Sequence, residues 1–168
     1  VAGRLLLDGA TLLGPLALNR PFRLPNAPID VLGFDESPDG LLAVAVVSFG
    51  DTLPRAVLEL WRGRTLEGSI SLPLLVVPGR GVLGELVRFS PTGREIVVGF
   101  PGAAIELLIV DAGRRRISLE LVPSSGFAWS PDGAWLARST RGEIVIAGAE
   151  RSEAAYVLPL AASDLAWR

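Results

Sequence analysis

The sequence predicts an all-β protein built from repeated units of four strands, and three observations carry that prediction. No part of the chain shows a sustained apolar pattern at i, i+3 and i+4, which would indicate an amphipathic helix. Short runs rich in Val, Ile, Leu and aromatic residues alternate with turn clusters, and the chain contains 19 Gly and 13 Pro. A turn of the type Ser-Pro-Asp-Gly occurs at 37–40, 90–93 and 130–133.

The residue types of this turn suit a tight connection between two antiparallel strands. Ser at the first position can bond the backbone ahead of it, and Pro at the second fixes φ near −65°. Asp or Thr suits the third position, and Gly at the fourth can adopt the left-handed conformation that lets the hairpin close. Three copies, each between apolar strands, indicate a repeat protein.

The predicted strands are short, rich in Val, Ile, Leu and aromatic residues, and separated by turn clusters. A last apolar segment, 164–168, has the character of the strand that precedes the turn at 130–133. The other predicted strands cover residues 4–7, 11–18, 22–24, 29–34, 41–48, 56–62, 68–72, 83–89, 95–100, 104–111, 116–121, 127–129, 134–138, 143–147 and 155–158.

The spacing of the turns predicts the blades of a β-propeller. The residue before each turn, or its equivalent near the C-terminus, is Glu36, Phe89, Trp129 or Trp167. The intervals are 53, 40 and 38 residues, as expected for four-stranded blades, and the first is lengthened by an insertion at 74–82. We therefore expect four blades of four antiparallel strands in a single domain, 1–168. The approximate repeat units are 1–27 plus 162–168, 28–73, 83–123 and 124–161.

The two ends of the chain share the phase of the repeat. Reading Trp167-Arg168 into Val1-Ala2-Gly3 reproduces the pattern that starts at Trp129, with Gly3 in the place of Gly133. The last strand would then pair with the N-terminal strands and supply the innermost strand that the first unit lacks, which leaves no open sheet edge. A partial propeller, cut from a longer array at a repeat boundary, would show the same phase, so both alternatives stay open.

Composition excludes several classes of function. The chain contains no His, Cys or Lys, which removes catalytic triads, Schiff-base lysines and zinc sites built on thiolate or imidazole. Carboxylate chemistry and oxygen-ligand metal binding remain open. The net charge is −2 with both signs scattered, so we expect no nucleic-acid partner. The longest apolar run, 41–47, is too short to span a membrane, and we expect no cofactor.

These residues carry a resemblance to a known family. The segments 37–43, 89–93 and 129–137 resemble the TolB-like, WD-type β-propeller repeats of bacterial periplasmic and surface proteins, and of propeller domains fused to some serine peptidases. The resemblance covers most of the chain as architecture. The first copy departs from the pattern, because Glu36 stands where an aromatic residue is expected and Phe34 lies two residues earlier. The register of that strand is therefore open.

The resemblance implies that one face of the ring carries the loops that bind a partner. In this chain that face would hold 49–55, 74–83, 99–102 and 139–142, and the insertion is the best candidate for partner contact. Charged residues of the first two loops, Asp51, Arg55 and Arg80, are candidate binding residues. The alternative is that the apolar insertion only packs over the mouth of the channel.

Three carboxylates are further candidate binding residues. Asp30, Glu85 and Asp164 lie near the starts of three predicted innermost strands and could line a central channel. There they could hold a hard cation or act as an acid–base pair on a sugar. Alternatively they bond backbone amides of neighbouring blades or face water. The four Trp residues could stack on sugars, but Trp129 and Trp167 fall at positions where blades bury aromatic area.

The sequence thus predicts a non-enzymatic scaffold that binds a protein through one loop-rich face, in the periplasm or outside a bacterial cell. One alternative is a carboxylate-based carbohydrate-active propeller, and another is the gating propeller of a peptidase. Self-association that completes a larger ring is a further alternative.

Overall fold

The prediction of an all-β chain is confirmed by a computed structural model. It describes residues 6–8, 11–13, 22–23, 29–48, 55–72, 87–100, 105–124, 126–140, 142–148, 154–160, 162 and 165–167, which form fifteen strands and no helix. The chain divides into two compact units, Val1–Glu85 and Leu86–Arg168. Each unit is described below by itself.

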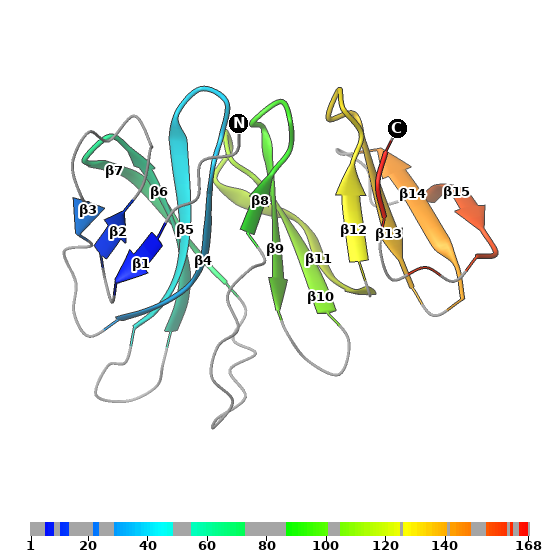
Figure 1. The fold of residues 1–168 in the computed structure, drawn as a ribbon, viewed down its shortest axis with the longest axis horizontal. Helices are drawn as coiled ribbons and strands as arrows, with labels where there is room; N and C mark the ends of the chain where they lie inside the picture. Colours follow the sequence, from blue (N-terminus) through cyan, green and yellow to red (C-terminus); the bar gives the residue numbers. More distant parts are fainter. Residues whose placement is uncertain are drawn as a thin grey trace. The chain divides into compact units, whose positions relative to one another are not determined.

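The first unit contains two antiparallel sheets in which consecutive strands pair (Figure 1). The larger sheet has the order β4-β5-β6-β7, and the smaller has the order β1-β2-β3. The larger consists of β4 (Ile29–Glu36), β5 (Leu41–Ser48), β6 (Arg55–Arg62) and β7 (Thr65–Ser71). The smaller consists of β1 (Leu6–Asp8), β2 (Thr11–Leu13) and β3 (Phe22–Arg23).

The second unit contains two four-stranded antiparallel sheets, again with consecutive strands paired (Figure 1). Among the strands described in either unit, no sheet closes on itself. The first sheet consists of β8 (Val87–Phe89), β9 (Glu95–Phe100), β10 (Ile105–Asp111) and β11 (Arg116–Ser124). The second consists of β12 (Gly126–Trp129), β13 (Trp135–Ser139), β14 (Ile144–Gly148) and β15 (Ala154–Leu158).

Central strands are buried on both faces, which explains the continuous apolar runs in the sequence. In β10, residues 107–110 are at most 4% exposed although successive side chains point to opposite faces. Residues 41–46 of β5 are likewise at most 8% exposed. A strand buried on both faces has no polar face, so it lacks the alternation of a half-exposed strand.

The three Ser turns have the geometry that their residue types predict. In each turn the Gly N–H donates to the Ser carbonyl oxygen over 2.8–3.0 Å, and the Gly φ is 81°, 73° or 70° for Gly40, Gly93 and Gly133. The Ser hydroxyl accepts the N–H of the residue that opens the next strand, at 2.8–3.1 Å. The turn closes its own hairpin and therefore belongs to the scaffold.

The first copy of the turn is one residue shorter than the other two. The hydroxyl of Ser37 reaches the N–H of Leu41, four residues on, whereas Ser90 and Ser130 reach five residues on. A register shift between Val31 and Gly33 also interrupts the pairing of β4 with β5. Phe34 lies two residues before Glu36 in β4, so the two side chains share a face, and Phe34 packs against the apolar cluster of its sheet in place of the aromatic residue missing at position 36.

A shared apolar cluster joins the two sheets of the second unit. Leu136 packs with Val97, Leu107 and Ile109 from β9 and β10. Phe127 and Trp129 of β12 pack against the same cluster, which confirms Trp129 as an anchor between stacked sheets. Burying apolar surface contributes roughly 25 cal/mol per Å² to stability, so the side chains of this cluster hold the two sheets together.

Candidate functional site

The structure places two of the six predicted site residues in strands. Asp30 lies in β4 opposite Val47, and Arg55 lies in β6 opposite Ser48, but their side chains are outside the described part. Asp51, Arg80, Glu85 and Asp164 lie outside the described residues, as does the insertion at 74–82. Within the part of the chain that the structure describes, no three acidic residues gather as a metal site would require.

Most turn carboxylates serve their own turns. The hydroxyl of Ser37 donates to Asp39, and the Arg62 guanidinium lies 3.1 Å from the same carboxylate. These two hydrogen bonds hold the pKa of Asp39 below its ordinary value. Hydrogen bonds from the Ser130 hydroxyl and the Ala134 N–H similarly lower the pKa of Asp132.

A lowered pKa is the opposite of what a general acid needs. Both carboxylates stay ionised and locally bonded at neutral pH, so they stabilise turns. Glu95, which is buried, also accepts a hydrogen bond from the hydroxyl of its own turn, Ser90, at 2.9 Å.

The pKa of Glu36 is raised above its ordinary value. Partial burial is the main cause, and the charge of Asp35 adds to it. These two residues are consecutive in β4, so their side chains leave opposite faces of the sheet. They therefore cannot flank one bond of a substrate as the carboxylate pair of a glycosidase does.

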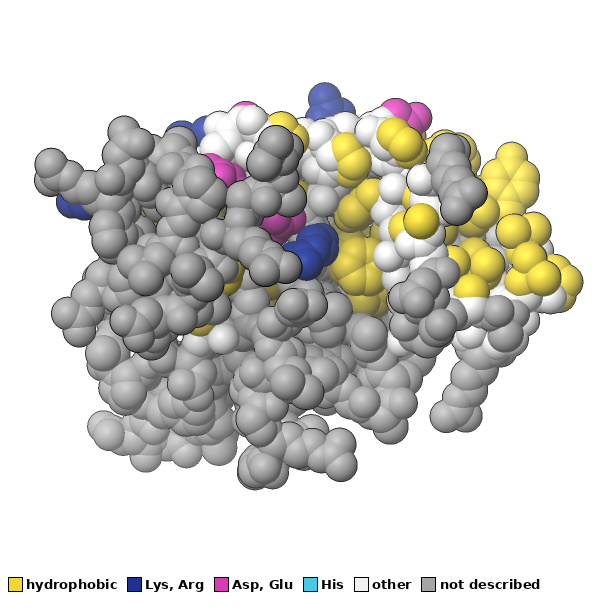
Figure 2. Space-filling model, viewed as in Figure 1, with side chains coloured by type: hydrophobic (Ala, Val, Ile, Leu, Met, Phe, Trp, Pro, Cys, Tyr) yellow, Lys and Arg dark blue, Asp and Glu magenta, His cyan; other side chains and the backbone are white. Residues whose placement is uncertain are grey.

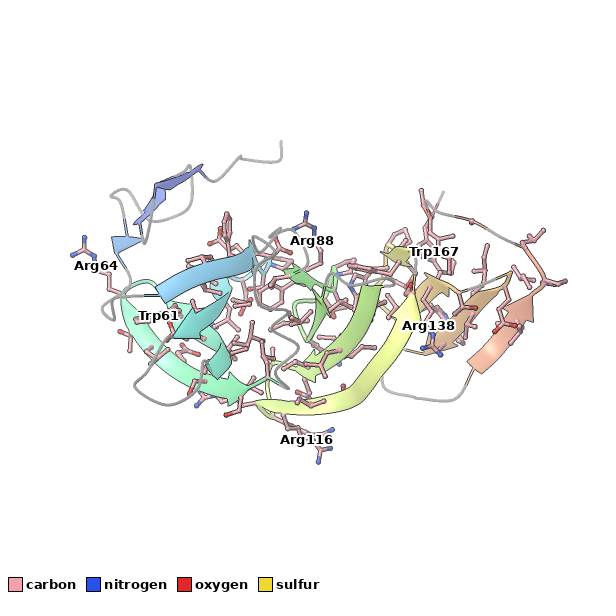
Figure 3. The ribbon with its side chains drawn as sticks, turned by 90° about the horizontal axis from the view of Figure 1, so that it is seen from below. Trp61, Arg64, Arg88, Arg116, Arg138 and Trp167 are labelled. Atoms are coloured by element: carbon pink, nitrogen blue, oxygen red, sulfur yellow. The ribbon has the colours of Figure 1, made fainter. Side chains whose placement is uncertain are left out.

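Among the described side chains of the second unit, two buried nitrogen atoms have no hydrogen-bond acceptor. They are Nε1 of Trp129 and Nη1 of Arg138, which have no hydrogen-bond partner. Burial lowers the pKa of Arg138, and the negative charge of Glu143 partly offsets that effect. Figure 3 shows Arg138 on the β12–β15 sheet, whereas Arg116 points away from its own sheet.

The outer strand of the same sheet exposes a continuous apolar strip, which we call the β15 edge and define as residues 155–160. All six are exposed, and none carries a charge. The largest exposed fractions are 61% for Tyr156, 57% for Leu160, 52% for Val157 and 41% for Leu158. Figure 2 shows hydrophobic side chains gathered over this part of the sheet.

The Trp residues fill several structural positions. Trp61 is 4% exposed in the core of its sheet and donates to Glu59. Trp135 contacts Tyr156, with ring centroids 6.2 Å apart and planes tilted by 54°. Trp167 is 37% exposed, and its Nε1 donates to the carbonyl oxygen of Ala128 at 3.0 Å (Figure 3). The four rings thus form no common surface on which a sugar could stack. Trp61 and Trp129 instead pack against apolar clusters of their sheets.

Sequence reasoning missed both Arg138 and the β15 edge. A signal for Arg138 existed, because a residue two positions from Leu136 in a strand shares its buried face. No signal marked the β15 edge, since its composition matches that of the buried strands and only its place at the end of the sheet exposes it.

Comparisons with known proteins add little to this geometry. No family of proteins matches the chain, and the curated proteins give no match either. Among solved structures, the chain is similar to a putative 6-phosphogluconolactonase from Bacteroides uniformis, with a TM-score of 0.38 and 12% identity. The alignment covers 94% of this chain and 70% of that one. In the described part of the chain, no helix is long and apolar enough to cross a membrane.

Proposed function

We propose that this chain is a β-propeller binding module without catalytic activity of its own, and that it holds an extended segment of a protein partner. The β15 edge is the observation that carries this proposal. The strand pairs with β14 on one side and lies at the end of its sheet order. An unpaired strand edge offers backbone N–H and C=O groups that an added strand can bond.

The composition of the β15 edge favours an apolar partner segment. Soluble proteins usually protect such edges with charges, but residues 154–158 carry none. Tyr156 and Leu158 are on one face of the strand and Val157 is on the other, so an added strand would meet exposed apolar area on both faces. Specificity would come from the alternating side chains, and affinity from the main-chain bonds.

The length of the strand favours a short peptide segment over a second copy of the chain. Five residues span roughly 17 Å, which allows only a few main-chain bonds. A stable pair of whole proteins buries roughly 1,200–2,000 Å² in total, far more than a five-residue strand provides. Pro159 follows the strand and has no N–H, which limits pairing beyond its end.

The propeller architecture is supported by the repeated anchoring of aromatic residues. Trp129 of β12 packs on the preceding sheet of its unit, and the Trp167 ring reaches the backbone of β12. Trp167 therefore contacts the β12–β15 sheet in the way that a residue of the inner strand of the next blade would. The β1–β3 sheet has three described strands where the others have four, and residues 165–167 would supply its fourth.

The loop-rich face and a periplasmic or extracellular location remain predictions of the sequence. In the proposed ring, β15 is the outermost strand of its blade, so it stays accessible whatever the loops bind. The carbohydrate-active alternative depends on Asp30, Glu85 and Asp164, and no observation on the described residues favours it.

Selection from a library of displayed random peptides tests the proposal. Purified chain is expected to enrich peptides with alternating apolar residues and no central Pro, with dissociation constants in the micromolar range, as is usual for small interfaces. Val157→Lys should weaken a synthetic peptide from this pool at least tenfold, because it places a charge on the pairing edge.

Leu66→Lys provides the matched control. Leu66 is 45% exposed in β7, which is also the last strand of a four-stranded sheet. This variant should bind the peptide like the unchanged chain. Enrichment of no common pattern, or equal binding by Val157→Lys, would rule out the β15 edge as the site.

A further inference from the structure

Two buried N–H donors in the second unit point to a second site. Both Nε1 of Trp129 and Nη1 of Arg138 are shielded from solvent and have no hydrogen-bond partner. A buried donor without an acceptor costs about 1–3 kcal/mol, and more when it belongs to a charged group. Native proteins hold only a few such groups per 100 residues, and each needs an explanation, such as a water molecule, an ion or another acceptor from outside the chain.

The two donors lie on the same face of the sheet. Trp129 pairs with Leu136 across β12 and β13, and Arg138 lies two residues beyond Leu136. Diagonal neighbours of this kind are roughly 7–8 Å apart at Cα, within reach of long side chains. The face that they share is the one that packs against Val97 and Ile109 of the neighbouring sheet. One ligand could therefore meet both donors.

Trp129 and Trp167 occupy equivalent repeat positions, but of these two residues only Trp129 lacks an acceptor for its indole N–H. The Nε1 of Trp167 donates to the carbonyl oxygen of Ala128. Ala128 directly precedes Trp129, which is the equivalent of Trp167 in the preceding repeat. The corresponding carbonyl for Trp129 is that of Arg88, yet its Nε1 bonds to no atom. The repeat thus provides an internal acceptor in one place and leaves it out in the other.

We propose that the Trp129 indole and the Arg138 guanidinium bind the carboxylate group of a small organic acid between the two sheets. A carboxylate offers two oxygen atoms with several lone pairs, so it can accept from both donors at once. Phe127 lies opposite Arg138 in the strand pairing and would line the apolar side of the ligand.

Charge favours a singly charged acid over a phosphate. Arg138 contributes one partly buried positive charge, and Glu143 places a negative charge near it. Arg88, on the facing side of β8, is exposed and donates to the carbonyl oxygen of Val87. A phosphate dianion would bring a second negative charge toward Glu143 without a second buried cation to compensate it. This site is separate from the β15 edge and does not depend on the function proposed above.

Side-chain NMR on the ¹⁵N-labelled chain tests the proposal, with sodium acetate as the probe. Four Trp residues give four indole resonances, and Trp129→Phe identifies the one from Trp129. Acetate should shift the Trp129 indole and the Arg138 guanidinium resonances along one saturable curve. Sodium chloride at equal ionic strength should leave them in place.

Arg138→Gln should abolish the saturable shift of the Trp129 indole, and Arg138→Lys should keep a weaker one. Arg116→Gln, an exposed arginine on another sheet, should leave the acetate curve unchanged. Linear shifts without saturation, or equal shifts with chloride, would overturn the site. Tighter binding of inorganic phosphate than of acetate would overturn the assignment to carboxylates. If Arg138→Gln does not fold, the Lys variant and the chloride arm still decide the question.

Discussion

Gly133 shows how one residue fixes the contact between two turns in the second unit. Its φ is +70°, and a Cβ built there would lie 2.8 Å from Cγ2 of Thr92 and 3.3 Å from its backbone N. An Ala would therefore meet both backbone strain and overlap with the neighbouring turn. Only the first of these was readable from the sequence, since the Ser-Pro-Asp-Gly pattern says nothing about Thr92.

Gly133→Ala is expected to lower the free energy of unfolding by about 3 kcal/mol, combining left-handed strain with overpacking. Gly63→Ala should cost only about 1 kcal/mol, because Gly63 also has a positive φ but nothing lies within 4 Å of its Cβ position. Urea unfolding curves measure both values. Adding Thr92→Ser to Gly133→Ala should restore part of the loss, and equal costs for the two Gly variants would refute the proposed overlap.

The turn carboxylates give a pH dependence of defined sign. Hydrogen bonding to Ser130 holds the pKa of Asp132 below its ordinary value of 3.8 in the folded chain. The stabilisation from this group is thus fully present above the pKa of the unfolded chain. It is lost as the pH falls through the lower folded value.

Asp132→Asn should therefore lose less stability than the unchanged chain when the pH falls from about 5 to about 3. Urea unfolding at a series of pH values measures this difference. Ser130→Ala is the control, because it removes the main cause of the lowered pKa and should flatten the same part of the curve. A curve for Asp132→Asn parallel to that of the unchanged chain would contradict this account.

At the scale of elements, strand existence could be predicted from the sequence, and strand exposure could not. The Val- and Ile-rich runs and the turn residues located nearly every strand of the four-stranded sheets. Exposure of β15 depends on its place at the end of a sheet, which composition does not record. The face of the sheet on which Arg138 lies depends on the register of β13. A change of one residue in the length of the turn would shift that register and move the side chain to the other face.

Leu136→Ala should lower the free energy of unfolding of the second unit by about 3 kcal/mol, because it opens a cavity in the cluster between its two sheets. Leu158→Ala in the same sheet should cost within about 0.5 kcal/mol, since Leu158 is exposed. Thermal or urea unfolding compares the two. A similar cost for both variants would mean that the cluster does not hold the sheets together.

At the scale of the whole molecule, the ring proposed above would have the four sheets as its blades. Repeat spacing predicted four strands per unit, and the four-stranded sheets agree with that prediction. Ring closure cannot be read from either unit alone, because the strands that would close it lie at opposite ends of the chain. In physical terms, closure depends on a few main-chain bonds whose partners are far apart in sequence.

A disulfide between the two ends tests ring closure most directly, because the chain has no natural Cys to compete. In β12 and β13, Trp129 pairs with Leu136, and Ala128 pairs with Ala137. If the last strand pairs with β1 in the same way, Trp167 pairs with Leu6. Ala166 should then face Leu7. Paired residues in neighbouring strands lie roughly 4.5–5.5 Å apart at Cα, within the range for a disulfide. Leu12, which faces Leu7 from β2, would be one strand too far.

The measurement is the mass and thiol content of the oxidised Leu7→Cys/Ala166→Cys chain beside the Leu12→Cys/Ala166→Cys control. The closed ring predicts a monomer with one internal disulfide in the first variant and free thiols in the second. Free thiols in a monomeric first variant, or disulfides only between chains, would contradict closure.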